Sequence, residues 1–147
     1  STSQDVEVYG NHVEVARGFG DGIVMIQQER GDGPHGRWRT SGNRVHGNLV
    51  IYHGENGISG AAGDYDNDAL FSSGNRFNGN EYMVLDPKDV HWAWGEAIKH
   101  RARYRTWPEL QKIGQEEDWQ LDIQPFKSLD RKCENMPVGP TLRRTAE

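Results

Sequence analysis

The sequence lacks the features that mark disulfide-bonded, membrane-spanning or thiolate-metal proteins. Its single cysteine, Cys133, excludes an intrachain disulfide and a thiolate metal site. No apolar run approaches the ~18 residues that a membrane-spanning helix needs, and no signal-peptide pattern is present. We therefore expect a soluble chain, and its localisation stays open. The net charge of −5 argues against nonspecific nucleic-acid affinity of the whole molecule.

Hydrophobic residues are also few, at 34% of 147 residues, against roughly 45–50% in a typical soluble domain. Five Trp, five Tyr and four Phe can nevertheless bury enough area for one folded domain. Glycine is abundant, with 18 residues concentrated in the first half of the chain. Glycine tolerates positive φ, so this half should consist of short strands joined by tight turns.

The pattern of apolar residues predicts an α+β fold, with a Gly-rich antiparallel β half followed by two short helices. Gly10-Asn11 should join two alternating segments as a hairpin, and no internal repeat is apparent. Further strands are expected over 22–26, 37–39, 48–53, 80–85 and 119–123, with helices from Pro87 to about Tyr104 and from Thr106 to Gly114. We expect one domain over residues 1–129 and a polar tail over 130–147.

Two of the expected strands carry one titratable group each. The strand 80–85 opens with Glu81 and runs into Asp86, and the strand 48–53 ends at His53-Gly54. The segment from Asn80 to Asp86 resembles the glutamate-bearing strand of ADP-ribosyltransferases, particularly the poly(ADP-ribose) polymerase type. Tyr52-His53-Gly54 resembles the strand end that holds the nicotinamide half of NAD in that family.

The resemblance implies a compact toxin- or effector-like enzyme that consumes NAD by ADP-ribosyl transfer or NAD glycohydrolysis. Glu81 and His53 would be catalytic: Glu81 would orient the ribose and stabilise the oxocarbenium-like centre, and His53 would hydrogen-bond a ribose hydroxyl. Tyr52, Gly54 and Tyr65 would contact the cofactor. Breaking an N-glycosidic bond develops positive charge, so a fixed carboxylate beside it assists most in the transition state.

A second hypothesis starts from the acidic segment around Tyr65. Asp64, Asp66 and Asp68 recur at alternate positions, and carboxylate oxygens suit a divalent cation. The segment lacks the later glycine and glutamate of an EF-hand loop. This hypothesis is a small ribonuclease or ribotoxin-like enzyme that cleaves RNA and could depend on such a divalent cation.

The same hypothesis draws on a set of acid, base and cation side chains for phosphodiester cleavage: His53, Glu55, Glu81, His91 and Arg76. Lys99, Arg101, Arg103 and Arg105 form a basic strip that could contact RNA. A third hypothesis is a noncatalytic module that binds a glycan or a protein. The acceptor, or partner, stays open under every hypothesis.

Overall fold

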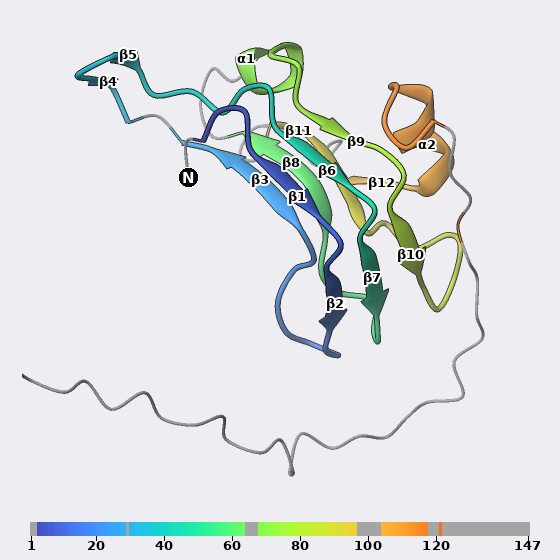
Figure 1. Ribbon diagram of the computed structural model, residues 1–147. Helices are drawn as coiled ribbons and strands as arrows, with labels where there is room; N and C mark the ends of the chain where they lie inside the picture. The colour runs from blue at the N-terminus through green and yellow to red at the C-terminus, as the bar shows by residue number, and fades with distance from the viewer. Residues whose placement is uncertain (1–2, 29, 64–67, 97–103, 118–120, 122–147) are drawn as a thin grey trace, which may run out of the picture.

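The computed structural model describes residues 3–28, 30–63, 68–96, 104–117 and 121 (Figure 1). Among the described residues, strand predominates and only two short helices occur. The expectation of an antiparallel β half followed by helices is therefore wrong. Most strands instead pair in parallel with strands more than thirty residues away in the sequence.

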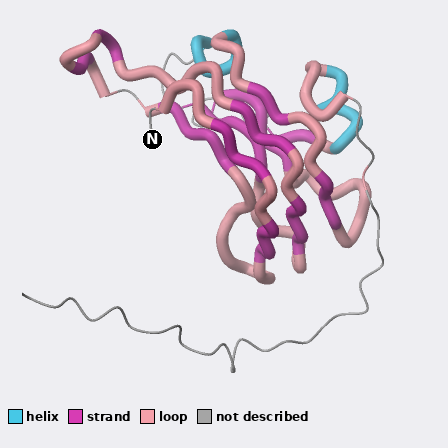
Figure 2. The backbone as a smooth tube through the Cα atoms, viewed as in Figure 1, coloured by secondary structure: helices cyan, strands magenta, loops and turns pink. Residues whose placement is uncertain are grey.

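The parallel strands form three stacked coils, each with three strands (Figure 2). The first coil contains β1 (Glu7–Tyr9), β2 (His12–Val15) and β3 (Val24–Gln27). The second contains β6 (Arg44–His46), β7 (Leu49–Tyr52) and β8 (Ser59–Gly63). The third contains β9 (Arg76–Phe77), β10 (Glu81–Met83) and β11 (Trp92–Glu96). Such stacking of like units makes the chain a short parallel β-solenoid.

Equivalent strands of successive coils lie side by side, so the solenoid has three sheets. Their strand orders are β1-β6-β9, β2-β7-β10 and β3-β8-β11, and β12 (Tyr104–Arg105) adds an antiparallel strand to β11. The connections between coils carry the remaining elements. A small hairpin, β4 (Asp32–Gly33) with β5 (Gly36–Arg37), follows the first coil, and α1 (Asp68–Ser72) follows the second.

The corners of the coils are built from a repeated Gly-Asn pair. The pairs are Gly10-Asn11, Gly42-Asn43, Gly47-Asn48, Gly74-Asn75 and Gly79-Asn80. All five glycines have positive φ, between 60° and 74°, which a side chain would oppose. The chain can therefore turn sharply from one sheet to the next, and the asparagine that follows each glycine is available for bonding between coils.

The asparagines form ladders along the solenoid axis. Asn11 donates from its backbone nitrogen and its Nδ2 to Oδ1 of Asn48, at 3.0 and 2.9 Å. Asn48 donates in the same way to Oδ1 of Asn80, at 3.1 and 2.8 Å. A second ladder repeats the pattern from Asn43 to Asn75, at 3.1 and 2.9 Å. Each rung satisfies a buried amide that would otherwise cost free energy, so the ladders stabilise the register of the coils.

The interior of the solenoid is one hydrophobic cluster to which all three coils contribute. Its largest side chains are at the third coil, where Trp92, Tyr82 and Trp107 contact one another edge-on or tilted. Trp94 packs edge-on against Phe77. The strands of the three coils therefore share a single core, as one domain requires.

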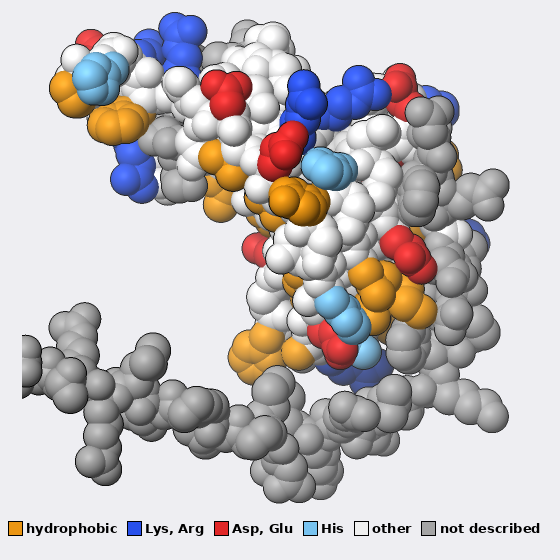
Figure 3. Space-filling model, viewed as in Figure 1, with side chains coloured by type: hydrophobic (Ala, Val, Ile, Leu, Met, Phe, Trp, Pro, Cys, Tyr) orange, Lys and Arg blue, Asp and Glu red, His pale blue; other side chains and the backbone are white. Residues whose placement is uncertain are grey.

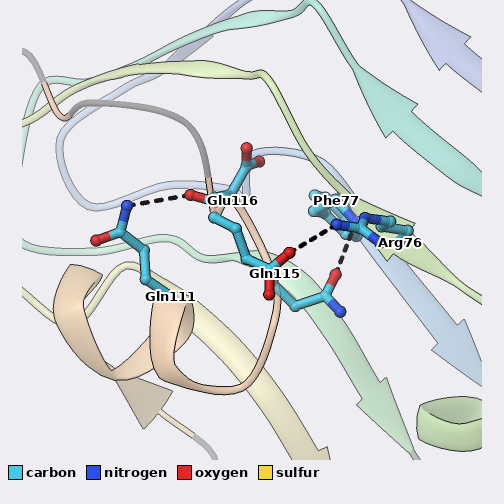
Figure 4. Close-up of polar contacts among 6 residues, drawn as sticks. Arg76, Phe77, Gln111, Gln115 and Glu116 are labelled. Atoms are coloured by element: carbon cyan, nitrogen blue, oxygen red, sulfur yellow. Dashed lines mark hydrogen bonds and ion pairs between the residues drawn. The ribbon is translucent and has the colours of Figure 1, made fainter.

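The third coil ends on a cap (Figure 4). The cap includes α2 (Trp107–Lys112), which begins with a capping box between Thr106 and Glu109, and the turn that follows α2. Gln115 accepts a bond from the backbone nitrogen of Phe77 at 2.8 Å, and the backbone nitrogen of Glu116 donates to the Phe77 carbonyl at 2.9 Å. Side chains and backbone of the cap thus replace the bonds that a fourth coil would make.

Several expected elements need correction. Strands occur where they were expected near residues 22–26, 48–53 and 80–85, but Gly10-Asn11 joins two different sheets and makes no hairpin. The helix expected from Pro87 to Tyr104 is wrong, because β11 occupies residues 92–96 and β12 residues 104–105. Only Arg37 of the 37–39 segment is in a strand, at the end of β5, whereas the helix after Thr106 is confirmed. The tail expected over 130–147, with Cys133, lies outside the described residues.

Among the described residues, no helix has the length and apolar character that crossing a membrane requires.

Candidate functional site

Two inward positions of the first coil are less completely buried than their counterparts in the other two coils, although Val15 and Met25 of the same coil are buried. Val8 and Val13 are only partly buried, although they occupy the same inward positions as fully buried residues of the later coils. Those counterparts are 1–2% exposed: Val45 and Phe77 for Val8, and Val50 and Tyr82 for Val13. Apolar surface therefore remains accessible at the first-coil end.

The first coil also presents open strand edges. Among the described strands, β1, β2 and β3 each pair with a single strand, which belongs to the second coil. The carbonyls of Asn11 and Val15 accept bonds from β7 and the residue after it. Because successive residues of a strand direct their N–H and C=O groups to alternate sides, those of His12 and Glu14 point to the open edge.

Asn11 is the exposed end of the longer asparagine ladder. Its Nδ2 donates to Oδ1 of Asn48 at 2.9 Å and to the carbonyl of Tyr9 at 3.0 Å. Among the described residues, all the side-chain hydrogen bonds of Asn11 are made by Nδ2, and Oδ1 accepts none. The Oδ1 atoms of Asn48 and Asn80, in contrast, each accept two hydrogen bonds. The first rung of the ladder thus offers an unused acceptor.

Tyr9 adds an aromatic surface to this end. Its ring stacks on that of His46 in the next coil, with centroids 5.4 Å apart and an angle of 7° between the planes. Tyr9 is 62% exposed, because its other face looks away from the second coil. The first-coil end therefore combines an apolar interior, free backbone groups, an amide acceptor and an aromatic face.

The opposite end shows what such a surface needs for closure. Glu116 is fully buried there and accepts from the backbone nitrogen and Nδ2 of Asn80, at 3.1 and 2.6 Å, and from the Tyr82 hydroxyl at 3.1 Å. Burial raises the pKa of Glu116, and the bonds from Asn80 and Tyr82 oppose that rise. Burial and the charge of Glu116 together raise the pKa of Tyr82. The carboxyl of Glu116 therefore terminates the asparagine ladder at a position buried from solvent.

The two residues expected to be catalytic lie on one outer face but do not converge. Glu81 aligns with Leu49 in the sheet, whereas His53 follows the end of β7, four positions further along. At ~3.3 Å per residue this offset is about 13 Å along the strands. The His53 imidazole instead pairs with Glu14 at 2.9 Å, and Glu14 also lies 3.5 Å from His12. The space-filling view shows histidine and acidic side chains beside one another on the face in view (Figure 3).

The residues expected to contact the cofactor make other contacts in the structure. Tyr52 is fully buried, its hydroxyl bonds Ser59 at 2.7 Å, and its ring stacks on His91 with centroids 4.0 Å apart. Burial raises the pKa of the Tyr52 hydroxyl, which keeps it protonated. Gly54 packs against Arg17, where an added Cβ would lie a tight 3.2 Å from the Arg17 Cα. Tyr65 lies outside the described residues.

The acid, base and cation side chains of the ribonuclease hypothesis are spread over the molecule. His91 is buried and shares a hydrogen bond of 3.0 Å with the Gly57 carbonyl, whereas Arg76 forms an ion pair with Glu117 in another part of the surface, at 2.9 Å. Glu55 is exposed in the loop after β7.

The remaining expected ligands can be placed only in part. Arg105 donates from its side chain to the Trp94 carbonyl at 3.1–3.2 Å, so it helps to close the edge of β11. Asp64, Asp66, Lys99, Arg101 and Arg103 lie outside the described residues, and Asp68 is the first residue of α1. Among the described residues, no group of three or more potential metal ligands is present.

A surface depression of about 350 Å³ lies at the first two coils and is lined by Asp5, Glu7, Gly42 and Arg44. Neither His53 nor Glu81 contributes to it. The transferase and ribonuclease hypotheses stay predictions, which release of nicotinamide from NAD and cleavage of RNA by purified Glu81→Gln and wild-type protein would test.

Sequence reasoning missed the residues that form the ladder and its ends. The signal was present in the repeated segments Val8-Tyr9-Gly10-Asn11, Val45-His46-Gly47-Asn48 and Phe77-Asn78-Gly79-Asn80. Each places an apolar residue three positions before an asparagine, and each is followed by an apolar residue two positions after it. A search for recurring Gly-Asn pairs would have revealed the coils, although neither Gln115 nor Glu116 belongs to the repeat.

Comparison of the chain with protein-family models, curated proteins and solved structures finds no match to any of them.

Proposed function

We propose that this chain is a noncatalytic protein-binding module that takes up an extended polypeptide at its first-coil end. The observation that carries the proposal is the contrast between the two ends of one solenoid. Two inward residues of the first coil, Val8 and Val13, are partly exposed, and nothing among the described residues caps that coil, whereas the third coil is capped by α2, by Glu116 and, at β11, by β12.

Strand addition is the binding mode that this surface suits. An incoming extended segment would bond the N–H and C=O groups of His12 and Glu14, while its apolar side chains would cover Val8 and Val13. Main-chain bonds would supply affinity, and the alternate side chains that enter the core would supply selectivity. The surface has no need of a catalytic group for this role.

The offset of about 13 Å between His53 and Glu81 also favours a binding role over bond cleavage. Glycosidic chemistry needs acidic or hydrogen-bonding groups around one reacting centre. On this surface each of the two groups lies beside different neighbours, with Glu14 next to His53 and Leu49 level with Glu81. The polar outer face therefore supports solvation of the sheet better than it supports a reaction.

The experiment is a selection of random extended peptides on the wild-type protein, followed by binding measurements on two variants. Glu14→Pro removes a backbone donor at the open edge and should weaken selected peptides at least about tenfold. Glu14→Ala removes the same side chain, including its pairing with His53, but retains the backbone donor and should bind normally. Far-UV circular dichroism checks that both variants are folded.

Peptides that bind Glu14→Pro as tightly as the wild-type protein would contradict the proposal. Saturable binding to a glycan array, with no selected peptides and no effect of Glu14→Pro, would also contradict it and would favour the glycan-binding alternative.

A further inference from the structure

The ladder of asparagines has a direction. In each rung the asparagine of the earlier coil donates two hydrogen bonds, and the Oδ1 atom of the later coil accepts both. The last acceptor in the series is the carboxyl of Glu116, which receives both donors of Asn80. The solenoid therefore presents an acceptor, Oδ1 of Asn11, at its first-coil end and buries an acceptor at the other.

This polarity decides what can cover the first-coil end. A second copy placed with its own first coil against this one would oppose two Oδ1 acceptors, so the rung could not form. A second copy placed in the same direction would have to use its third coil, where Glu116, Gln115 and β12 already occupy the edge. A complementary partner must bring donors to Asn11 and leave the cap undisturbed.

We infer that the partner is an extended segment that supplies a further coil with an asparagine in register with Asn11, an inference that rests on the proposed function. The backbone nitrogen and Nδ2 of the incoming asparagine would both donate to Oδ1 of Asn11, as Asn11 does to Asn48. The segment would run parallel to β2, because every rung within the solenoid joins parallel strands.

The repeat also specifies the residues around the incoming asparagine. The residue three positions before it should be apolar, as Val8 and Val45 are, and the residue two positions after it should be apolar, as Val13 and Val50 are. A ring two positions before the asparagine would stack on the exposed face of Tyr9, in the way that His46 stacks on its other face. Glycine should precede the asparagine, since each corner of the solenoid has positive φ there.

The chain contains a suitable probe in its own second coil. A synthetic peptide with the sequence of residues 42–53 carries Gly47-Asn48 in the right register, with His46 and Val50 at the flanking positions. Titration of the full chain with this peptide, followed by calorimetry and by backbone amide NMR, should give saturable binding with shifts centred on His12 and Glu14. A peptide with Asn48→Ala is the matched control and should bind at least about tenfold more weakly.

The two peptides and the two Glu14 variants separate this inference from the proposed function. Binding of both peptides with equal affinity, lost in Glu14→Pro and kept in Glu14→Ala, would overturn the asparagine register while leaving strand addition in place. Binding that Glu14→Pro leaves unchanged would overturn both. Absence of binding by the 42–53 peptide, with selected unrelated peptides still sensitive to Glu14→Pro, would overturn the inference alone.

Discussion

The two ends of the solenoid solve the same chemical problem to different extents. Each end of a stack of parallel strands exposes inward apolar side chains, backbone groups and one terminal member of the asparagine ladder. At the third coil Glu116 receives the donors of Asn80, and Trp107 covers Tyr82 and Trp92. At the first coil Asn11 is exposed and Val13 only partly buried. The difference shows that particular side chains, and not the stacking of strands alone, terminate the solenoid.

The buried carboxyl at the capped end is held by an unusual backbone. Glu116 has a φ of 53°, in the left-handed region that costs a non-glycine residue roughly 1 kcal/mol or more. Its backbone nitrogen and both carboxyl oxygens are bonded, and Gln111 donates to its carbonyl at 3.1 Å. These bonds offset the strain and place the carboxyl under the last rung.

The largest loss of stability is expected from a substitution in the middle of the asparagine ladder. Asn48→Ala removes two accepted bonds and three donated ones, to Val8, His46 and Asn80, in a buried position. We expect it to lower the free energy of unfolding by about 3–5 kcal/mol, because several buried partners lose their bonds. Asn11→Ala, at the exposed end, should lower it by about 1 kcal/mol, since water can replace its partners. Urea denaturation measures both; equal losses would contradict the difference between the ends.

A smaller loss is expected at the cap. Glu116→Ala leaves the donors of Asn80 and Tyr82 without an acceptor, so the free energy of unfolding should fall by about 2–4 kcal/mol. Glu117→Ala is the neighbouring control. It breaks only the half-exposed ion pair with Arg76, and its effect should be under about 1 kcal/mol. Thermal and chemical denaturation of the two variants should rank them in this order. A reversed order would show that Glu116 does not stabilise the cap.

Truncation of equivalent valines tests the same difference between a covered coil and the first coil. Val50→Ala empties a position that is 1% exposed, and should cost about 2 kcal/mol through lost burial and a residual cavity. Val13→Ala deletes the same atoms at the equivalent, partly buried position of the first coil, and should cost less than about 1 kcal/mol. If urea denaturation gave Val13→Ala the larger loss, the first-coil end would be closed in solution.

The pH dependence of stability tests the capped end alone. The pKa of Glu116 is raised in the folded state, so folding favours the protonated carboxyl. Its contribution is most favourable below the ordinary glutamate pKa and declines as pH rises from that value through the raised folded pKa. Glu116→Gln keeps an acceptor for Asn80 and should remove this decline. Denaturation midpoints across that pH range, compared between wild type and variant, would refute the assignment if the two curves were parallel.

The sequence predicted individual strands better than their partners. Alternation of apolar residues located β7 and β10, and the capping box located α2. The hairpin at Gly10 failed because neighbouring strands in the sequence belong to different sheets, so pairing depends on residues 32–37 positions away. The helix from Pro87 failed because Trp92 and Trp94 both point inward at strand spacing, a choice that the cap and core impose.

The candidate site was less accessible to such reasoning. His53 and Glu81 attracted interest as titratable groups at strand ends, but their separation depends on a register that no local pattern reports. The exposure of Val8 and Val13 depends on which coil is first in the stack. The Gly-Asn repeat could have been recognised in the sequence, whereas the role of Glu116 is apparent only from the fold.

The position of the cap near residue 116 has a consequence for biosynthesis. The carboxyl that terminates the ladder and the helix that covers the core are made after all three coils. A nascent chain that has emerged only as far as β11 would have an uncovered third coil, and the pairings between its coils would all join residues more than thirty positions apart, which form slowly. Only when the turn that follows α2 has emerged, with Glu116, would the third-coil surface be withdrawn from contact with chaperones and other chains.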